Sequence, residues 1–118
     1  MRMAFLYEAV LAMRADADTG APGAAVTKAL CGHWDHEPPC PLAPHHSTVT
    51  RAGDGIRLRV LFAVEPALES TVRRRIEAAL SDGRLVGPEG EVEWTVTSSG
   101  RTELTADERR HAEHLLRK

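Results

Sequence analysis

The stretch from Gly53 to Val64 constrains the fold of this chain more than any other part of the sequence. Its first three residues, Gly-Asp-Gly, have the composition of a tight hairpin turn. Large apolar side chains then occupy every second position: Ile56, Leu58, Val60, Phe62 and Val64. Arg57 and Arg59 lie between them. A period of two predicts a β-strand with one buried face and one face that is at least partly solvated.

The segments on either side of this strand extend the pattern to a full order of elements. The sequence predicts a strand at residues 3–14, a helix at 22–30, strands at 47–52 and 56–64, a helix at 66–82, a strand at 91–97 and a last helix from residue 105. Residues 3–14 also fit a helical stripe, and the strand is preferred because the order then becomes β-α-β-β-α-β. This order predicts an α+β fold. It is that of a ferredoxin-like βαββαβ plait, an antiparallel sheet with two helices on one face, with an added C-terminal helix.

The same patterns predict which side chains build the core. Apolar residues of the strands at 56–64 and 91–97 are expected beneath the apolar stripe of the helix at 66–82. The set is Leu58, Val60, Phe62, Val92, Trp94 and Val96 beneath Leu68, Val72, Ile76 and Leu80. Arg57 and Arg59, on the other face, are expected to be solvated or to pair across the sheet with Glu8 and Glu93.

The last helix has a clear start and a thin apolar face. Thr105 and Glu108 have the spacing of a capping box, in which each residue satisfies a backbone N–H of the other. Its apolar residues are Ala112, Leu115 and Leu116. His111 and His114 lie about one turn apart, a spacing that can bind a metal, but they are expected to be ordinary surface histidines near a helix end.

Composition limits the classes of function. The chain has 118 residues, of which 42% are apolar, and this suits one globular domain over residues 1–118. A formal net charge of −2 argues against a dedicated nucleic-acid or membrane-surface binder, and no apolar run reaches the length of a membrane span. The excess of Arg over Lys and the absence of Asn and Gln are typical of bacteria with high-GC genomes. The expected location is the cytoplasm, where cysteines stay reduced.

The segment from Cys31 to His46 carries the most distinctive chemistry. It contains both cysteines, four of the six histidines and four of the seven prolines. Thiolate and imidazole are preferred ligands of zinc, and prolines reduce the entropy that a loop loses when it becomes ordered. The candidate metal ligands are Cys31, His33, His36, Cys40, His45 and His46, and zinc is the expected cofactor.

Other roles for this segment stay open, because it lacks the Cys-x2-Cys knuckle found in many zinc sites. Cys31 and Cys40 can form a disulfide, although a reducing compartment disfavours one. Alternatively, the segment packs on the core through Trp34 and Leu42 without a metal, and Cys31 acts as a small buried apolar residue.

The motif Gly-His-Trp-x-His at residues 32–36, followed by Cys40 and two histidines at 45 and 46, resembles small uncharacterised proteins of high-GC bacteria. The resemblance covers about a seventh of the chain and implies no activity. Heavy-metal-associated domains share the plait but carry a Cys-x2-Cys between the first strand and the first helix. Residues 16–21 contain no cysteine, which argues against copper chaperoning.

Two principal hypotheses on function follow, and whether the chain is an enzyme stays open. In the first, it is a non-enzymatic domain that a metal at residues 31–46 stabilises or regulates, and it acts through a protein partner or as a homodimer. In the second, it is a small-molecule enzyme on a dimeric plait, in which His33, His36 or the metal does acid–base or Lewis-acid work. Nucleic-acid binding through the open sheet face is less favoured, because that face lacks aromatic residues. In a plait, Glu65 is expected at the same end of the sheet as residues 31–46, where it can join a metal site or cap the following helix.

Overall fold

The computed structural model describes residues 1–31, 43–87 and 90–117. Its elements are β1 (Met3–Ala12), α1 (Ala21–Cys31), β2 (His45–Ala52), β3 (Gly55–Val64), a 3-10 turn (Pro66–Leu68), α2 (Glu69–Ser81), β4 (Arg84–Gly87), β5 (Gly90–Glu93), β6 (Thr95–Arg101) and α3 (Ala106–Leu116). The fold is α+β, as the sequence predicts. In this part of the chain, no helix is both long enough and apolar enough to cross a membrane.

Four of the strands form one antiparallel sheet, in the spatial order β2-β3-β1-β6. The ambiguous N-terminal segment is a strand, and it pairs with β3 from Met3 opposite Val64 to Ala12 opposite Gly55. The pairing of β2 with β3 runs without a break from His45 opposite Phe62. A shift of register between Val10 and Leu11 interrupts the pairing of β1 with β6.

The prediction of a single strand at residues 91–97 is wrong, because Trp94 interrupts it and separates β5 from β6. The first half, β5, pairs with β4 in a separate hairpin, and the second half, β6, joins the main sheet. The Trp94 backbone N–H donates to the Gly83 carbonyl at 2.9 Å, and its indole Nε1 donates to the Leu80 carbonyl at 2.8 Å. These bonds hold Trp94 at the C-terminal end of α2. Trp94 therefore belongs neither to the β4–β5 hairpin nor to the main sheet.

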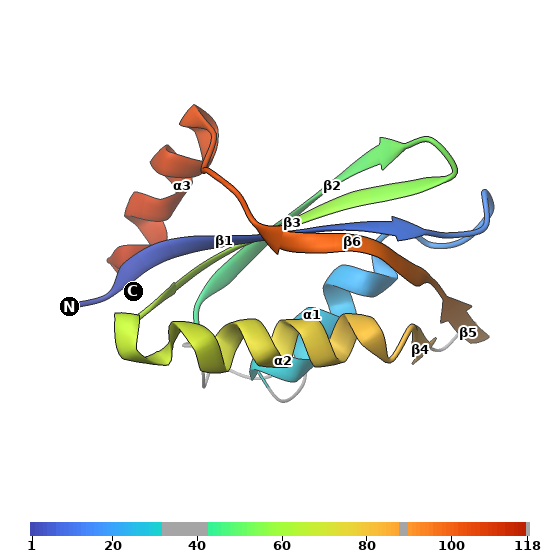
Figure 1. The fold of residues 1–118 in the computed structure, drawn as a ribbon, viewed down its shortest axis with the longest axis horizontal. Coiled ribbons are helices and arrows are strands. Elements are labelled where there is room, and N and C mark those ends of the chain that lie inside the picture. Colours follow the sequence, from blue (N-terminus) through green and yellow to red (C-terminus); the bar gives the residue numbers. More distant parts are fainter. Residues whose placement is uncertain (32–42, 88–89, 118) are drawn as a thin grey trace.

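The sheet separates two apolar layers (Figure 1). α1 and α2 cover one face, and α3 lies against the other face. The larger layer includes Tyr7, Leu11, Val26, Leu30, Leu58, Phe62, Val72, Ile76 and Leu80. The smaller layer contains Leu6, Leu61, Ala63, Ala112 and Leu115. The sheet face expected to be open is therefore partly covered by the C-terminal helix.

Most of the predicted core is buried. Leu58, Val60, Phe62 and Trp94 on the strands, and Val72, Ile76 and Leu80 on α2, are buried, while Val92 and Val96 are half-buried. The prediction that Leu68 is buried is wrong, since its side chain is 41% exposed. It belongs to the 3-10 turn that precedes α2, and a 3-10 turn has three residues per turn rather than 3.6. The helical stripe therefore does not extend back to this position.

The hairpin between β2 and β3 is made by the glycines that the sequence places there. Gly53 has a φ of 56°, in the left-handed region that favours glycine. A Cβ atom on Gly55 would lie 1.8 Å from the backbone oxygen of Leu11, so only glycine fits where β3 passes β1. The turn fixes the register of β2 on β3 and so places His45 and His46 at the opposite end of the sheet.

Candidate functional site

The predicted metal ligands lie around the connection between α1 and β2. Cys31 is the last residue of α1, and His45 and His46 are the first two residues of β2. His33, His36 and Cys40 lie outside the described residues, as do the Trp34 and Leu42 anchors. The structure thus gives the place of both ends of the candidate segment.

A hydrogen bond joins these two ends of the segment. Nε2 of the His45 ring lies 3.0 Å from the hydroxyl oxygen of Thr27, one turn before the end of α1. Nδ1 of the same ring lies 3.3 Å from the Ala43 carbonyl oxygen. The Thr27 hydroxyl also lies 3.1 Å from the Gly23 carbonyl, one turn earlier in the helix. His45 therefore attaches the start of β2 to the last turns of α1.

His46 faces the other side of the sheet. Successive residues of a strand point to opposite faces, and the ring of His46 stacks on that of His111 in α3, with centroids 3.9 Å apart. His114 meets His111 edge-on at 6.3 Å. We call His46, His111 and His114 the imidazole row. Because His45 faces α1 and His46 faces α3, a single ion cannot take both rings as ligands.

The environment of His46 favours its neutral form. Burial lowers the pKa of His46, nearby His111 lowers it further, and Glu108 opposes them. Across the residues that the structure describes, no three histidine, cysteine, aspartate or glutamate side chains are arranged to hold a metal ion. The sequence places His111 and His114 one turn apart, but it does not predict that His46 joins them, because it does not show that α3 lies beside the start of β2. The apolar residues of the last helix indicated only that it packs on some surface.

Arg59 is the centre of an ion-pair cluster on the same face of the sheet. Its Nε and Nη2 donate to the two carboxylate oxygens of Glu108 at 2.8 Å each, and Nη1 pairs with Glu8. Nη2 also donates to the Glu103 carbonyl at 2.8 Å. The expected pairing with Glu8 is confirmed, whereas Glu93 lies opposite Arg84 in the separate hairpin. Arg59 thus connects α3 to the sheet.

The Glu108 carboxylate has a second role, in the capping box. Its Oε1 accepts a hydrogen bond from the Thr105 backbone N–H at 2.8 Å, and its own backbone N–H donates to the Thr105 hydroxyl at 3.2 Å. The capping box is therefore confirmed. Hydrogen bonds from Arg59 hold the pKa of Glu108 below its usual value, and the same pairing raises the pKa of Arg59. One carboxylate therefore both begins α3 and fastens it to the sheet.

Acid is expected to weaken this attachment. Because the folded pKa of Glu108 lies below its ordinary value of 4.5, the unfolded state binds more protons near that pH, and stability is lost as the pH falls through the folded pKa. Glu108→Gln should be less stable at neutral pH and should lose less stability between about pH 6 and pH 3. Thermal melts across this range measure the slope, with exposed Glu113→Gln as the control. Equal slopes for Glu108→Gln and wild type would contradict the assignment.

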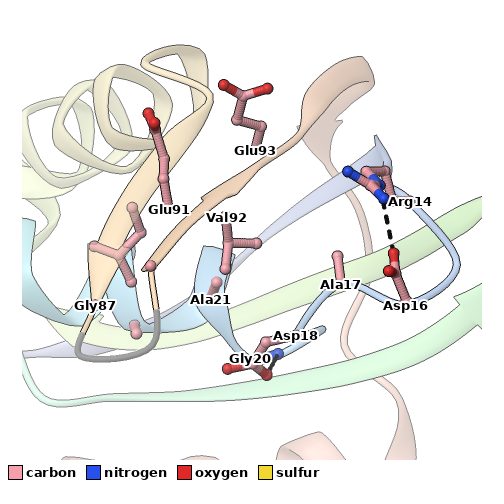
Figure 2. Close-up of a pocket in the computed structure, with 13 residues that line it drawn as sticks. Arg14, Asp16, Ala17, Asp18, Gly20, Ala21, Gly87, Glu91, Val92 and Glu93 are labelled. Atoms are coloured by element: carbon pink, nitrogen blue, oxygen red, sulfur yellow. Dashed lines mark hydrogen bonds and ion pairs between the residues drawn. The ribbon is translucent and has the colours of Figure 1, made fainter.

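A wide groove lies at the other end of the molecule, between the loop before α1 and the β4–β5 hairpin (Figure 2). It encloses about 690 Å³ and has carboxylates on both walls: Asp16 and Asp18 on the loop, Glu91 and Glu93 on β5. Arg14 lies 3.4 Å from Asp16, and Asp18 accepts a hydrogen bond from the Gly20 backbone. The described lining contains no serine, cysteine, histidine or lysine.

Glu65, expected near the candidate segment, binds the amino group of Met1 at 2.7 Å and makes no side-chain cap on the following turn. It lies just after Val64, at the end of β3 that pairs with the start of β2. Glu65 and His45 are thus at the same end of the sheet, as expected.

No protein-family model, curated protein or solved structure matches the chain, so its function is inferred from its own residues.

Proposed function

We propose that this chain is a non-catalytic α+β domain that binds zinc through the segment from Cys31 to His46 and acts by associating with a protein, in the cytoplasm. The observation that carries the proposal is the contact between Thr27 and His45, which are 3.0 Å apart. It brings the last turns of α1, which end at Cys31, to the start of β2. Ligands from both ends of the segment therefore start close together.

The proposed fold is a ferredoxin-like plait with the β4–β5 hairpin inserted before its last strand. The order β2-β3-β1-β6 supports this proposal, because it places the second, third, first and fourth strands of a plait side by side. The packing of α1 and α2 on one face also supports it. In such a fold the first helix and the second strand fix both ends of the segment that connects them. Less conformational entropy is then lost when a metal orders that segment.

The proposed ligands are two thiolates and two imidazoles from Cys31, His33, His36, Cys40 and one of the pair His45 and His46. A site closed by four protein ligands is structural, whereas a catalytic zinc keeps a position for water. Of the two, His45 lies on the face of the sheet where α1 ends at Cys31, whereas His46 lies against α3 on the other face, so His45 is the better candidate, and zinc would replace its contact with Thr27 or Ala43. The neutral form of histidine is the one that binds a metal.

The ion pairs on the α3 face of the sheet argue against nucleic-acid binding through that face. Arg59, a partly buried cation on this face, is engaged by Glu8 and Glu108 rather than directed at an open surface. Its role is to hold α3 in place. A phosphate-binding face requires cations whose hydrogen-bond donors remain available.

Metal removal tests the proposal. Zinc at a hundred times its Kd stabilises a folded protein by about 2.7 kcal/mol, which raises Tm on the order of 10 °C. EDTA should therefore lower the Tm of untagged wild type by roughly this amount. Cys40→Ser should start from the lower Tm and respond little to EDTA. His114→Ala removes an imidazole outside the segment and should respond as wild type does.

An unchanged Tm of wild type in EDTA, with Cys40→Ser equally stable, would overturn the zinc site. Treatment with a reducing agent then separates the remaining alternatives. A disulfide between Cys31 and Cys40 predicts a loss of stability on reduction. Packing without a metal predicts none.

A further inference from the structure

The two edges of the sheet differ in how they are protected against pairing with another strand. β6 has a register shift against β1, and α2 reaches toward its end, where Arg101 pairs with Glu69. Bulges and charged residues are common devices that keep an edge from pairing. β2 is a regular strand of eight residues whose pairing with β3 is unbroken. Among the described residues, no strand pairs with its outer edge.

The hydrogen-bond pattern shows which groups this edge presents. Ala63 donates its N–H to the Pro44 carbonyl at 3.0 Å, so Pro44 faces β3. In an antiparallel ladder, residues alternate between those that bond to the neighbour and those that face away. Every second residue from Pro44 therefore bonds to β3. The residues between them, which include Ser47, Val49 and Arg51, direct their N–H and C=O groups outward.

We propose that the outer edge of β2 pairs antiparallel with the same edge of a second copy, with the two-fold axis at Val49. This inference deepens the proposed association of the domain and does not depend on the metal. It extends the four-stranded sheet to a continuous sheet of two subunits. Val49 then faces Val49 of the second copy, and Ser47 faces Arg51 of the second copy. Each of these pairs exchanges backbone hydrogen bonds.

The side chains of β2 suit pairing with themselves. The exposed centre of the strand is Thr48, Val49 and Thr50, which are β-branched and uncharged. At this register Thr48 faces Thr50 of the second copy, and the Val49 side chain, 38% exposed in the monomer, contacts its counterpart. The two Arg51 residues lie four positions apart along the ladder, roughly 13 Å, which exceeds the screening length of about 8 Å at physiological salt.

A second copy fits this edge better than a charged peptide does. The centre of the strand has no charge that would attract one, and a two-fold axis lets one uncharged sequence supply both sides of the interface. Pairing through one edge alone buries less than the roughly 1,200 Å² of a standard interface, so the dimer should be weak and reversible.

Sedimentation velocity and light scattering test the dimer over about 5–500 µM, the range in which weak interfaces dissociate. Wild type should dimerise as its concentration rises, with and without EDTA. Val49→Lys places two like charges at the axis and should weaken the dimer by more than about tenfold. Val49→Glu should do the same. An equimolar mixture of the two variants should form a heterodimer, because the opposite charges then meet.

Two further variants separate edge pairing from other effects. Val49→Pro removes an outward N–H that makes no bond to β3, so it should abolish the dimer and leave the fold intact by circular dichroism. Ser98→Lys adds the same charge at an exposed position of β6, on the opposite edge of the sheet, and should dimerise as wild type does. A wild type that stays monomeric to about 500 µM, or a dimer indifferent to Val49→Lys, would overturn the inference. Zinc binding without a dimer, or a dimer without zinc, distinguishes this inference from the proposed function.

Discussion

Replacing Phe62 with alanine is expected to lower the free energy of unfolding by about 3–5 kcal/mol, the usual cost of deleting a buried aromatic side chain. Phe62 is completely buried in β3, between β1 and β2. Its ring lies 5.6 Å from that of Phe5, and the guanidinium of Arg73 lies 5.4 Å above it. The substitution removes apolar contacts on several sides and leaves a cavity that the sheet cannot close.

Urea denaturation followed by circular dichroism measures this loss. Leu68→Ala is an informative control, because the sequence pattern puts Leu68 in the core, whereas the structure leaves it 41% exposed. We expect this variant to lie within about 1 kcal/mol of wild type. If Leu68→Ala cost as much as Phe62→Ala, the start of α2 would have to be packed differently.

Arg59→Met is expected to destabilise the protein by about 2–4 kcal/mol, because it leaves two partly buried carboxylates without their cation. The side chains of Arg59, Glu108 and Glu8 are 16%, 11% and 26% exposed. Water screens such charges poorly, so an unpaired carboxylate costs more here than on the surface. The loss should fall mainly on the attachment of α3 to the sheet.

Hydrogen exchange of the α3 amides and urea denaturation together measure this effect. Arg57→Met is the matched control, since Arg57 is 50% exposed and lies 3.8 Å from Glu8, and it should cost less than about 1 kcal/mol. A double-mutant cycle with Glu108→Gln should show coupling of about 1–3 kcal/mol. Equal effects of Arg57→Met and Arg59→Met would contradict the role assigned to Arg59.

The sheet could be predicted largely because its signals are local. Alternation with a period of two identifies β3, and Gly53 and Gly55 define the turn that joins it to β2. The N-terminal segment was ambiguous by itself, and its assignment as a strand depended on the order of the other elements. Its odd-numbered residues, such as Tyr7 and Leu11, lie under α1 and α2, whereas Leu6 lies under α3. Both faces of β1 are apolar, which is why a helical stripe fitted equally well.

The errors arose where a tertiary contact breaks a local pattern. Val92, Trp94 and Val96 keep the alternation of a strand across the break, so sequence periodicity cannot reveal it. The break depends on bonds from Trp94 to Leu80, in the last turn of α2, and to Gly83, two residues after the helix. The position of α3 on the sheet could not be predicted either, because a capping box shows where a helix begins and not which surface it covers.

The metal site stays a prediction from residue type. Thiolates and imidazoles indicate a metal, but their spacing does not show which side of the sheet each one faces. The structure adds that His45 and His46 point to opposite faces, toward Thr27 and His111. Only one partner of Arg59 could be predicted. Glu8 follows from cross-strand pairing, whereas the bond to Glu108 joins residues that lie far apart in the sequence.

The zinc content of the untagged protein is the most direct test of the proposed function. Purified without chelators and dialysed, wild type should carry about one zinc per chain by elemental analysis, with the ion retained under native mass spectrometry. Cys40→Ser should lose most of it, and His114→Ala should retain it. A wild-type protein that contains no transition metal, and takes up none when zinc is added to its reduced form, would contradict the account.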